Sequence, residues 1–209
     1  MSIKINYSKK ISSKISSNLV LFCDEKYSIN GLKKYLSNTE FSYITDLLKT
    51  IDIKKNLFLY EVNSKKKIVL VSIKKNLKTS EIENLGAEFC KRINLGKNSE
   101  YFIISDSIVG KNDHFLGHFL HGLKLKSYEF KKYKTKKEAR SIYINVIGVK
   151  NIPSNKNQLK FKALEEGTFF TRDLVSEPGN VLHPDEYAKR LSALRKVGLK
   201  INIYDKKKL

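Results

Sequence analysis

The sequence predicts an α/β layered fold, because segments with the pattern of strands alternate along the chain with segments with the pattern of helices. Leu19 to Cys23 is a continuous apolar run, which is typical of a strand buried on both faces of a sheet. Ser80 and Glu83 have the spacing of a capping box, which predicts the start of a helix that buries Ile82, Leu85, Phe89 and Ile93. Glu40 to Ile51 predicts another helix, with one apolar face formed by Phe41, Ile44, Leu47, Leu48 and Ile51.

The other elements of the first 150 residues are short strands and helices in alternation. Strands are predicted at Ile3 to Tyr7, Leu57 to Val62, Lys67 to Ile73, Tyr101 to Ser105 and Ser141 to Val149. The second and third of these are joined at Asn63 to Lys66, which indicates a hairpin. Helices are predicted at Ser28 to Leu36 and at Asp113 to Leu123.

After these elements the chain predicts a linker, a helix and a tight turn. Lys150 to Asn157, which contains Pro153, is the candidate linker. Leu159 to Ser176 follows as a connecting helix. Proline, glycine and asparagine are typical turn residues, and they follow the helix as Pro178, Gly179 and Asn180.

A second helix is predicted directly after this turn. His183 is expected at its N-cap and Pro184 at its first position, where the fixed φ and missing N–H of proline are tolerated. Two acidic residues after the proline place negative charge at the positive end of the helix. Helical spacing predicts a buried stripe of Tyr187, Leu191, Leu194 and Val197. Gly198 is expected to end the helix before a strand at Lys200 to Tyr204.

Length and composition favour a globular chain of more than one domain. The 209 residues are 41% hydrophobic, which is enough for a real core. The sequence contains no run of about eighteen apolar residues, so we expect no transmembrane helix. The first ten residues, MSIKINYSKK, lack the apolar core of a secretory signal. Cys23 and Cys90 lie far apart without metal-ligand spacing, and they suit a reducing cytoplasm as buried small hydrophobic residues.

The formal net charge of +20 raises nucleic acid or an anionic membrane as a partner. Only five of the 41 basic residues are arginine, the side chain that reads guanine edges and forks onto phosphate. We therefore interpret the charge as a solvated lysine surface. Non-specific, salt-sensitive affinity for nucleic acid would be its expected consequence.

Two stretches of the chain carry patterns of a known family. Arg172 to Pro184 reads RDLVSEPGNVLHP and resembles the start of the catalytic domain in the leucyl aminopeptidase (cytosol aminopeptidase) family, Arg-Asp-Leu-Val-Asn-Glu-Pro-x-Asn-x-Leu-Thr-Pro. Ser176 and His183 depart from that pattern, and neither change removes a catalytic group. The family's Gly-x-x-Leu-x-x-Tyr-x-Phe-x-x-Tyr-Lys segment is matched by Gly122, Leu125, Tyr128, Phe130, Tyr133 and Lys134.

The resemblance implies a domain organisation. Residues 1–150 would form an amino-terminal α/β domain similar to the macro domain, and 151–176 the linker and connecting helix. Residues 177–209 would be the incomplete start of the catalytic domain, with its first helix and strand. The full-length family member is a cytoplasmic metallopeptidase that removes amino-terminal residues from peptides, with two divalent ions, zinc or manganese, in a homo-hexamer. The remainder of the catalytic domain is therefore the expected partner of this chain, and no membrane is expected.

The segments that hold the two ions in this family are missing from the sequence. They read Gly-Lys-Gly-x-x-x-Asp-Ser-Gly-Gly and Asn-Thr-Asp-Ala-Glu-Gly-Arg, and neither occurs here. We therefore expect no catalytic, cofactor-binding or metal-binding residue in the chain, no cofactor, and no hydrolysis of a leucyl substrate by these residues alone. The alternative is a stand-alone basic α/β binding protein, with non-specific affinity for nucleic acid.

Three other groups of residues raise the question of a binding site. His114, His118 and His121 share one face of a predicted helix and have the spacing of a metal-binding cluster, although no nearby ligand except Asp113 completes it. Aromatic and basic residues alternate after this helix and allow two interpretations. They could form a platform for single-stranded nucleic acid, or an extended packed connection whose lysines face solvent. These residues are Tyr128, Phe130, Tyr133, Lys131, Lys132, Lys134, Lys136 and Lys137. Ser107 to Lys111 contains a single glycine, which is too few for a loop that cradles a nucleotide phosphate.

The turn between the last two helices also has two interpretations. Glu177, Pro178 and Asn180 could border the catalytic cleft, or they could form a helix connection held by side-chain hydrogen bonds of Asn180, which we favour. The apolar residues of the two helices need cover that the missing catalytic domain would supply. We therefore expect an exposed apolar patch near the connecting helix or near Leu182 to Tyr204, unless another chain covers it.

Overall fold

The computed structural model describes residues 2–9, 17–50, 55–93, 99–110, 114–135 and 141–204. The predictions for Ile51, Lys111, Asp113, Lys136 and Lys137 lie outside these residues. The chain divides into two compact units, Met1–Glu165 and Glu166–Leu209. The domain boundaries that we place after residues 150 and 176 remain predictions.

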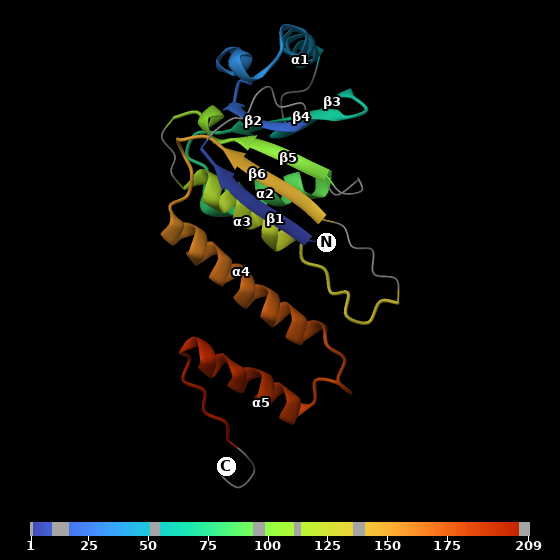
Figure 1. Ribbon diagram of the computed structural model, residues 1–209, viewed down its shortest axis with the longest axis vertical. Coiled ribbons are helices and arrows are strands. Elements are labelled where there is room, and N and C mark those ends of the chain that lie inside the picture. Colours follow the sequence, from blue (N-terminus) through green and yellow to red (C-terminus); the bar gives the residue numbers. More distant parts are fainter. Residues whose placement is uncertain are drawn as a thin grey trace. The chain divides into compact units, whose positions relative to one another are not determined.

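The first unit is built around a six-stranded mixed sheet with the strand order β1-β6-β5-β2-β4-β3 (Figure 1). The strands are β1 (Ser2–Ser8), β2 (Asn18–Asp24), β3 (Leu57–Asn63), β4 (Lys66–Ile73), β5 (Ser99–Ile104) and β6 (Ser141–Ile147). All neighbouring strands are parallel except β3 and β4, which form the predicted antiparallel hairpin. The predicted α/β class and the six predicted strands of this unit are therefore confirmed.

Helices cover both faces of this sheet (Figure 1). The 3-10 helix η1 (Asn30–Tyr35) and α1 (Asn38–Thr50) lie on one face, and α2 (Thr79–Ile93) and α3 (Phe115–Lys126) lie on the other. In β2, Val20 and Phe22 pack toward α2 and α3, whereas the alternate residues pack toward α1. Because both faces are covered, every apolar residue of this strand is buried, as its unbroken apolar run predicts.

The two helices on the same face, α2 and α3, approach until their backbones touch. A Cβ atom on Gly122 would lie 1.9 Å from the carbonyl oxygen of Glu83, and one on Gly86 would lie 1.9 Å from that of Phe119. Each helix therefore places a glycine against the main chain of the other. Glycine is unfavourable in a helix interior by roughly 1 kcal/mol, so its presence at both contacts has a steric reason.

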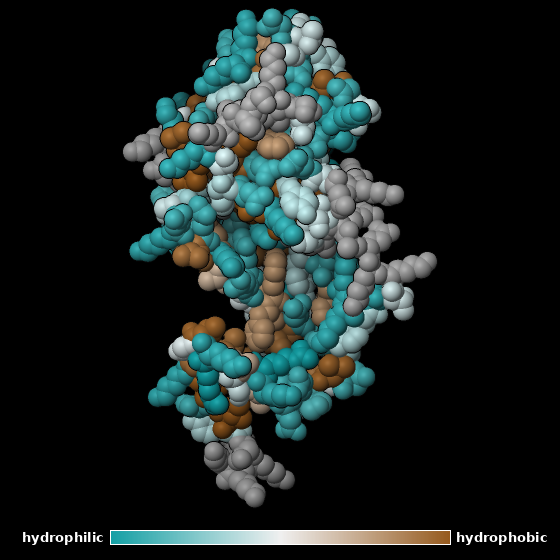
Figure 2. Space-filling view, viewed as in Figure 1, coloured by the Kyte–Doolittle hydropathy of each residue, from teal (hydrophilic) through white to brown (hydrophobic). Residues whose placement is uncertain are grey.

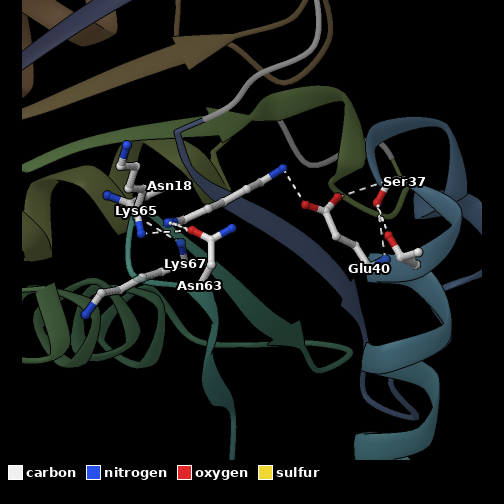
Figure 3. Close-up of polar contacts among 8 residues, drawn as sticks. Asn18, Ser37, Glu40, Asn63, Lys65 and Lys67 are labelled. Carbon is white, nitrogen blue, oxygen red and sulfur yellow. Dashed lines mark hydrogen bonds and ion pairs between the residues drawn. The ribbon is translucent and has the colours of Figure 1, made fainter.

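A polar network fixes the edge of the sheet where β2 and β4 begin (Figure 3). The side chain of Asn18 accepts a hydrogen bond from the Lys67 amide and donates one to the Glu100 carbonyl, which links β2 to both neighbours. The Asn63 side chain accepts from the amides of Lys65 and Lys66 and so forms the hairpin turn.

The same edge holds the amino terminus of α1. Glu40 and Ser37 exchange hydrogen bonds as a capping box, and Glu40 also pairs with the Lys66 ammonium at 2.7 Å (Figure 3). Burial alone would raise the pKa of Glu40, but its hydrogen bonds from Lys66 and Ser37 outweigh burial and lower it. The pair therefore attaches α1 to the hairpin through a carboxylate that stays ionised.

The short helix predicted at Ser28 to Leu36 is present as the 3-10 helix Asn30–Tyr35, in which only Leu32 is buried. Two other element predictions for the first unit need correction. The capping box of α2 is not formed by Ser80 and Glu83, since the helix starts at Thr79 and Glu81 accepts from the Lys78 amide. The predicted last strand ends early, at Ile147, where Gly148 adopts a φ of +146°.

The second unit contains two helices and no strand among its described residues. Helix α4 (Asn155–Ser176) begins before the predicted Leu159 and continues into this unit, and α5 (Pro184–Ser192) follows the turn. The segment Ala193–Val197 is a 3-10 helix that ends at Gly198, whose φ is +89°. The predicted strand at Lys200 to Tyr204 is wrong, because no described segment supplies a strand for it to pair with.

The glycine contact predicts a large loss of stability in the variant Gly122→Ala. The added methyl group would meet backbone atoms of Glu83, which no side-chain rotation can relieve, so we expect the free energy of unfolding to fall by about 3 kcal/mol or more. Urea denaturation followed by circular dichroism measures the change. The control is Gly31→Ala, whose Cβ would meet nothing within 4 Å and should change the free energy of unfolding by about 0.5 kcal/mol or less. Equal effects of the two substitutions would contradict the contact.

Candidate functional site

The segment with the strongest family pattern forms a tight connection between two helices of the second unit. The amide of Glu177 closes the last turn of α4 on the carbonyl of Asp173. The amides of Val181 and Leu182 both donate to the carbonyl of Pro178 at 2.9 Å, which completes the turn. His183 is the N-cap of α5 and proline starts the helix, as predicted.

A buried charge pair holds this connection together. The Glu177 side chain is only 1% exposed, and its Oε1 accepts a hydrogen bond from Nη1 of Arg190 at 3.0 Å. The Arg190 Nε donates to Glu186 at 3.0 Å, one turn earlier on α5. Hydrogen bonding to Glu186 and then Glu177 raises the pKa of Arg190, while its hydrogen bond to Glu186 lowers the pKa of that carboxyl. Arg190 therefore joins the end of α4 to α5 as a permanent cation.

This pair corrects our prediction for the turn. The side chain of Asn180 is exposed and makes no hydrogen bond in the described part of the chain, so it does not hold the connection. Glu177 has that role instead, with Arg190 as its partner. The sequence contains both residues, but their separation of thirteen positions across a turn matches no short-range pattern.

The apolar residues of the second unit are largely exposed. Tyr187 is 44% exposed and Val197 73%, so the stripe predicted on α5 is not buried by the described residues. Figure 2 shows hydrophobic side chains at the surface of the segment that carries α5. Exposed large hydrophobic residues also include Val175, Leu199, Ile203 and Tyr204. Single large apolar side chains between Leu182 and Tyr204 are therefore exposed, as expected, whereas their union into one patch stays a prediction.

The three histidines that carry the metal hypothesis have different surroundings. His114 is the N-cap of α3, whereas His118 and His121 lie on the helix and are each paired with a carboxylate through Nδ1. Among the described residues, no three histidine, cysteine, aspartate or glutamate side chains are grouped so that they could hold a metal ion. Asp113, the further ligand that the hypothesis names, lies outside the described residues, so the absence of a metal site stays a prediction.

The segment after α3 is irregular, and its aromatic residues are covered to different degrees. Tyr128 and Phe130 are half-buried, whereas Tyr133 is 52% exposed. The rings of Phe130 and Tyr133 lie 5.8 Å apart, and the Lys132 ammonium lies over the Tyr133 ring. Partial burial fits the packed connection better than an open stacking platform, although the lysine side of the segment faces solvent.

None of the helices in the described part of the chain combines the length and the apolar character that a membrane span requires.

The two cysteines are both buried, as expected, and burial raises the pKa of Cys23 to about 12. Both thiols are therefore protonated and unreactive at neutral pH.

Comparison with known proteins identifies the family. No family model matches the sequence. A probable cytosol aminopeptidase of Dinoroseobacter shibae is 33% identical over 138 residues, which are 66% of this chain and 27% of that protein. One from Rhodopseudomonas palustris (strain BisA53) is 26% identical over 207 residues, which cover 93% of this chain and 42% of the relative. The chain belongs to the leucyl aminopeptidase family.

Solved structures agree with this assignment at the level of the fold. A tomato leucine aminopeptidase mutant has a TM-score of 0.72 at 14% identity, covering 99% of this chain and 45% of that chain. The cytosol aminopeptidase from Coxiella burnetii has a TM-score of 0.63 at 12% identity, covering 96% and 40%. The chain thus spans less than half the length of these leucyl aminopeptidases and of the curated relatives it matches.

The charge pair predicts that Arg190→Met weakens the helix connection. The substitution keeps an unbranched apolar stem but removes the cation from the buried Glu177 carboxylate, so the free energy of opening of α5 should fall by more than it does when an exposed lysine is replaced. Hydrogen exchange of the α5 amides measures it. Lys189→Met is the matched control, because this ammonium is highly exposed and lies 3.6 Å from Glu186, so a loss of about 0.5 kcal/mol or less is expected. A double mutant Glu177→Gln/Arg190→Met whose loss equals the sum of its single losses would argue against the pair.

Proposed function

We propose that this chain is the amino-terminal portion of a cytoplasmic, metal-dependent aminopeptidase that removes amino-terminal residues from peptides. The observation that carries the proposal is its similarity to a probable cytosol aminopeptidase along 207 residues, which make up 42% of that relative. In this proposal the described residues contribute assembly and support, and the chemistry belongs to polypeptide beyond them.

The described residues do not fit a two-metal centre. They contain no group of three suitable ligands, and the sequence lacks both ligand segments of the family. The solved structure of the bottromycin maturation enzyme BotP in complex with Mn, which is similar in fold, supports manganese as one metal used within this fold. We propose that two ions, zinc or manganese, are held downstream of this chain, which by itself binds neither and is inactive.

The exposed apolar side chains of the second unit support a docking role. Tyr187, Val197 and Tyr204 are at least 44% exposed, and burying such large apolar side chains against a partner is favourable. We propose that the remainder of the catalytic domain covers these residues. We further propose that the complete enzyme is a homo-hexamer, as the family resemblance implies.

The first test is the activity of the 209-residue chain on a leucyl reporter substrate with added Mn²⁺ or Zn²⁺. We expect no turnover above the rate without protein, because no described group can activate water on a metal pair. Chelator-sensitive turnover that co-purifies with the chain would contradict the proposed inactivity.

The second test is the coding sequence after Leu209. We expect the reading frame to continue into the Asp-Ser-Gly-Gly segment, and we expect the extended chain to hydrolyse the same reporter. A natural stop after Leu209 would overturn the proposal and favour a stand-alone binding protein.

A further inference from the structure

The carboxyl edge of the sheet contains a point where the connections of two neighbouring parallel strands leave toward opposite faces. After β2 the chain enters η1 and α1 on one face of the sheet, whereas after the adjacent β5 it enters α3 on the other face. In an open α/β sheet, the loops that follow two such strands diverge and leave a crevice in which ligands bind. The topology of the first unit therefore marks the ends of β2 and β5 as a place for a ligand.

Two adjoining cavities lie at this edge of the first unit. The first has a volume of about 410 Å³ and is bounded by the loops that follow β2, β4 and β5. The second has a volume of about 790 Å³ and is bounded mainly by the loop after β6 and the start of α4. Gly110 lines both cavities, which makes them neighbours. Each cavity has the size of a typical pocket for a small molecule.

The loops that bound the cavities have fixed shapes. Non-glycine residues with a positive φ are uncommon, yet Tyr27, Asn76 and Asn151, which follow β2, β4 and β6, have φ values of 55°, 59° and 60°. Surrounding contacts must hold such conformations. Oδ1 of Asp106, for example, accepts hydrogen bonds from two successive amides after β6, at 2.9 and 2.7 Å. The crevice is therefore preorganised, which lowers the entropic cost of binding a ligand.

The first cavity carries positive charge. Its ammonium groups belong to Lys26, Lys74 and Lys75, and none of them forms a salt bridge with a described residue. Asp24 and Glu25 also line this cavity, so three cations are present with two carboxylates. The loop after β5 has too few glycines to cradle a phosphate with its amides, so the ammonium groups are the donors that a phosphate would use.

The second cavity is lined mainly by uncharged hydrogen-bonding groups. Asn151, Ser154 and Asn157 contribute amide and hydroxyl groups, and Val149 and Ile152 contribute apolar contacts. No phenylalanine, tyrosine or tryptophan is among the described residues that line either cavity, so none of these rings is available to stack on a nucleobase. This lining matches the hydroxyl groups and carbon skeleton of a polyol better than a base.

We propose that this crevice binds a small phosphorylated polyol, such as a sugar phosphate. The ammonium groups of Lys26, Lys74 and Lys75 hold the phosphate in the first cavity, and the side chains of Asn151 and Asn157 bind hydroxyl groups in the second. The first unit then carries a metabolite site of its own, which the proposed peptidase function does not require.

Titration of the isotope-labelled 209-residue chain with glucose 6-phosphate, followed by NMR at physiological ionic strength, tests the proposal. Salt at this level screens attraction to the lysine surface as a whole. We expect saturable shifts confined to the amides of the loops after β2, β4, β5 and β6. Glucose alone and inorganic phosphate alone should bind much more weakly, because each fills only one of the two cavities.

Two double variants, each lacking two positive charges, separate the site from the overall charge. Lys74→Gln/Lys75→Gln should weaken binding about tenfold or more, because two hydrogen bonds to a charged phosphate are lost. Lys65→Gln/Lys91→Gln is the matched control, since these lysines are exposed and line neither cavity, and it should change the affinity by about twofold or less.

Several outcomes would overturn the proposal. Equal losses in the two double variants, shifts spread over the lysine surface, or no saturation at millimolar ligand would each contradict a site in the crevice. Inorganic phosphate that binds as tightly as the sugar phosphate would contradict the polyol, and adenosine monophosphate that binds more tightly would indicate a nucleotide instead. The location of the shifts in the wild-type chain decides the question if Lys74→Gln/Lys75→Gln does not fold.

Discussion

The backbone contact between α2 and α3 is the constraint on which the first unit depends. Gly86 and Gly122 each lack the atom that would keep the helices apart, so the main chains meet at two points, Gly122 on Glu83 and Gly86 on Phe119. Contact at this distance fixes the rotation of α3 about its axis. The apolar side of α3 then faces the sheet, where Phe115 and Phe119 pack on Phe22 edge to face, and its histidines face α2 and α4. The same geometry explains why Gly122 opens one of the two patterns by which the sequence resembles its family.

The sequence predicts the strands of the sheet well because the apolar pattern that marks a buried strand lies within the strand itself. A buried parallel strand must be apolar on both faces, and Leu19 to Cys23 satisfies that requirement without any information from distant residues. The proline and glycine signals at the ends of α5 and its following 3-10 segment are local in the same way. Elements of this kind can be assigned from composition and spacing alone.

The remaining features depend on residues that are far apart in the sequence. Its spacing from Ser80 predicts that Glu83 completes a capping box, yet its carboxylate pairs with His118, which lies 35 positions later. Gly86 has no local signal, because a helical glycine reveals its role only when the partner helix is known. The Glu177 and Arg190 pair bridges a turn in the same manner, and it replaces the Asn180 contact that local turn chemistry suggested.

The most direct measurement of the central constraint is a proton NOE spectrum of the assigned chain. Backbone contact between α2 and α3 predicts strong cross-peaks from the Gly122 Hα protons to Glu83 Hα and from the Gly86 Hα protons to the Leu123 amide, because a Cβ on these glycines would lie 2.6 Å from Glu83 Cα and 2.9 Å from Leu123 N. Absence of both cross-peaks, with each helix otherwise intact, would contradict the backbone contact between α2 and α3.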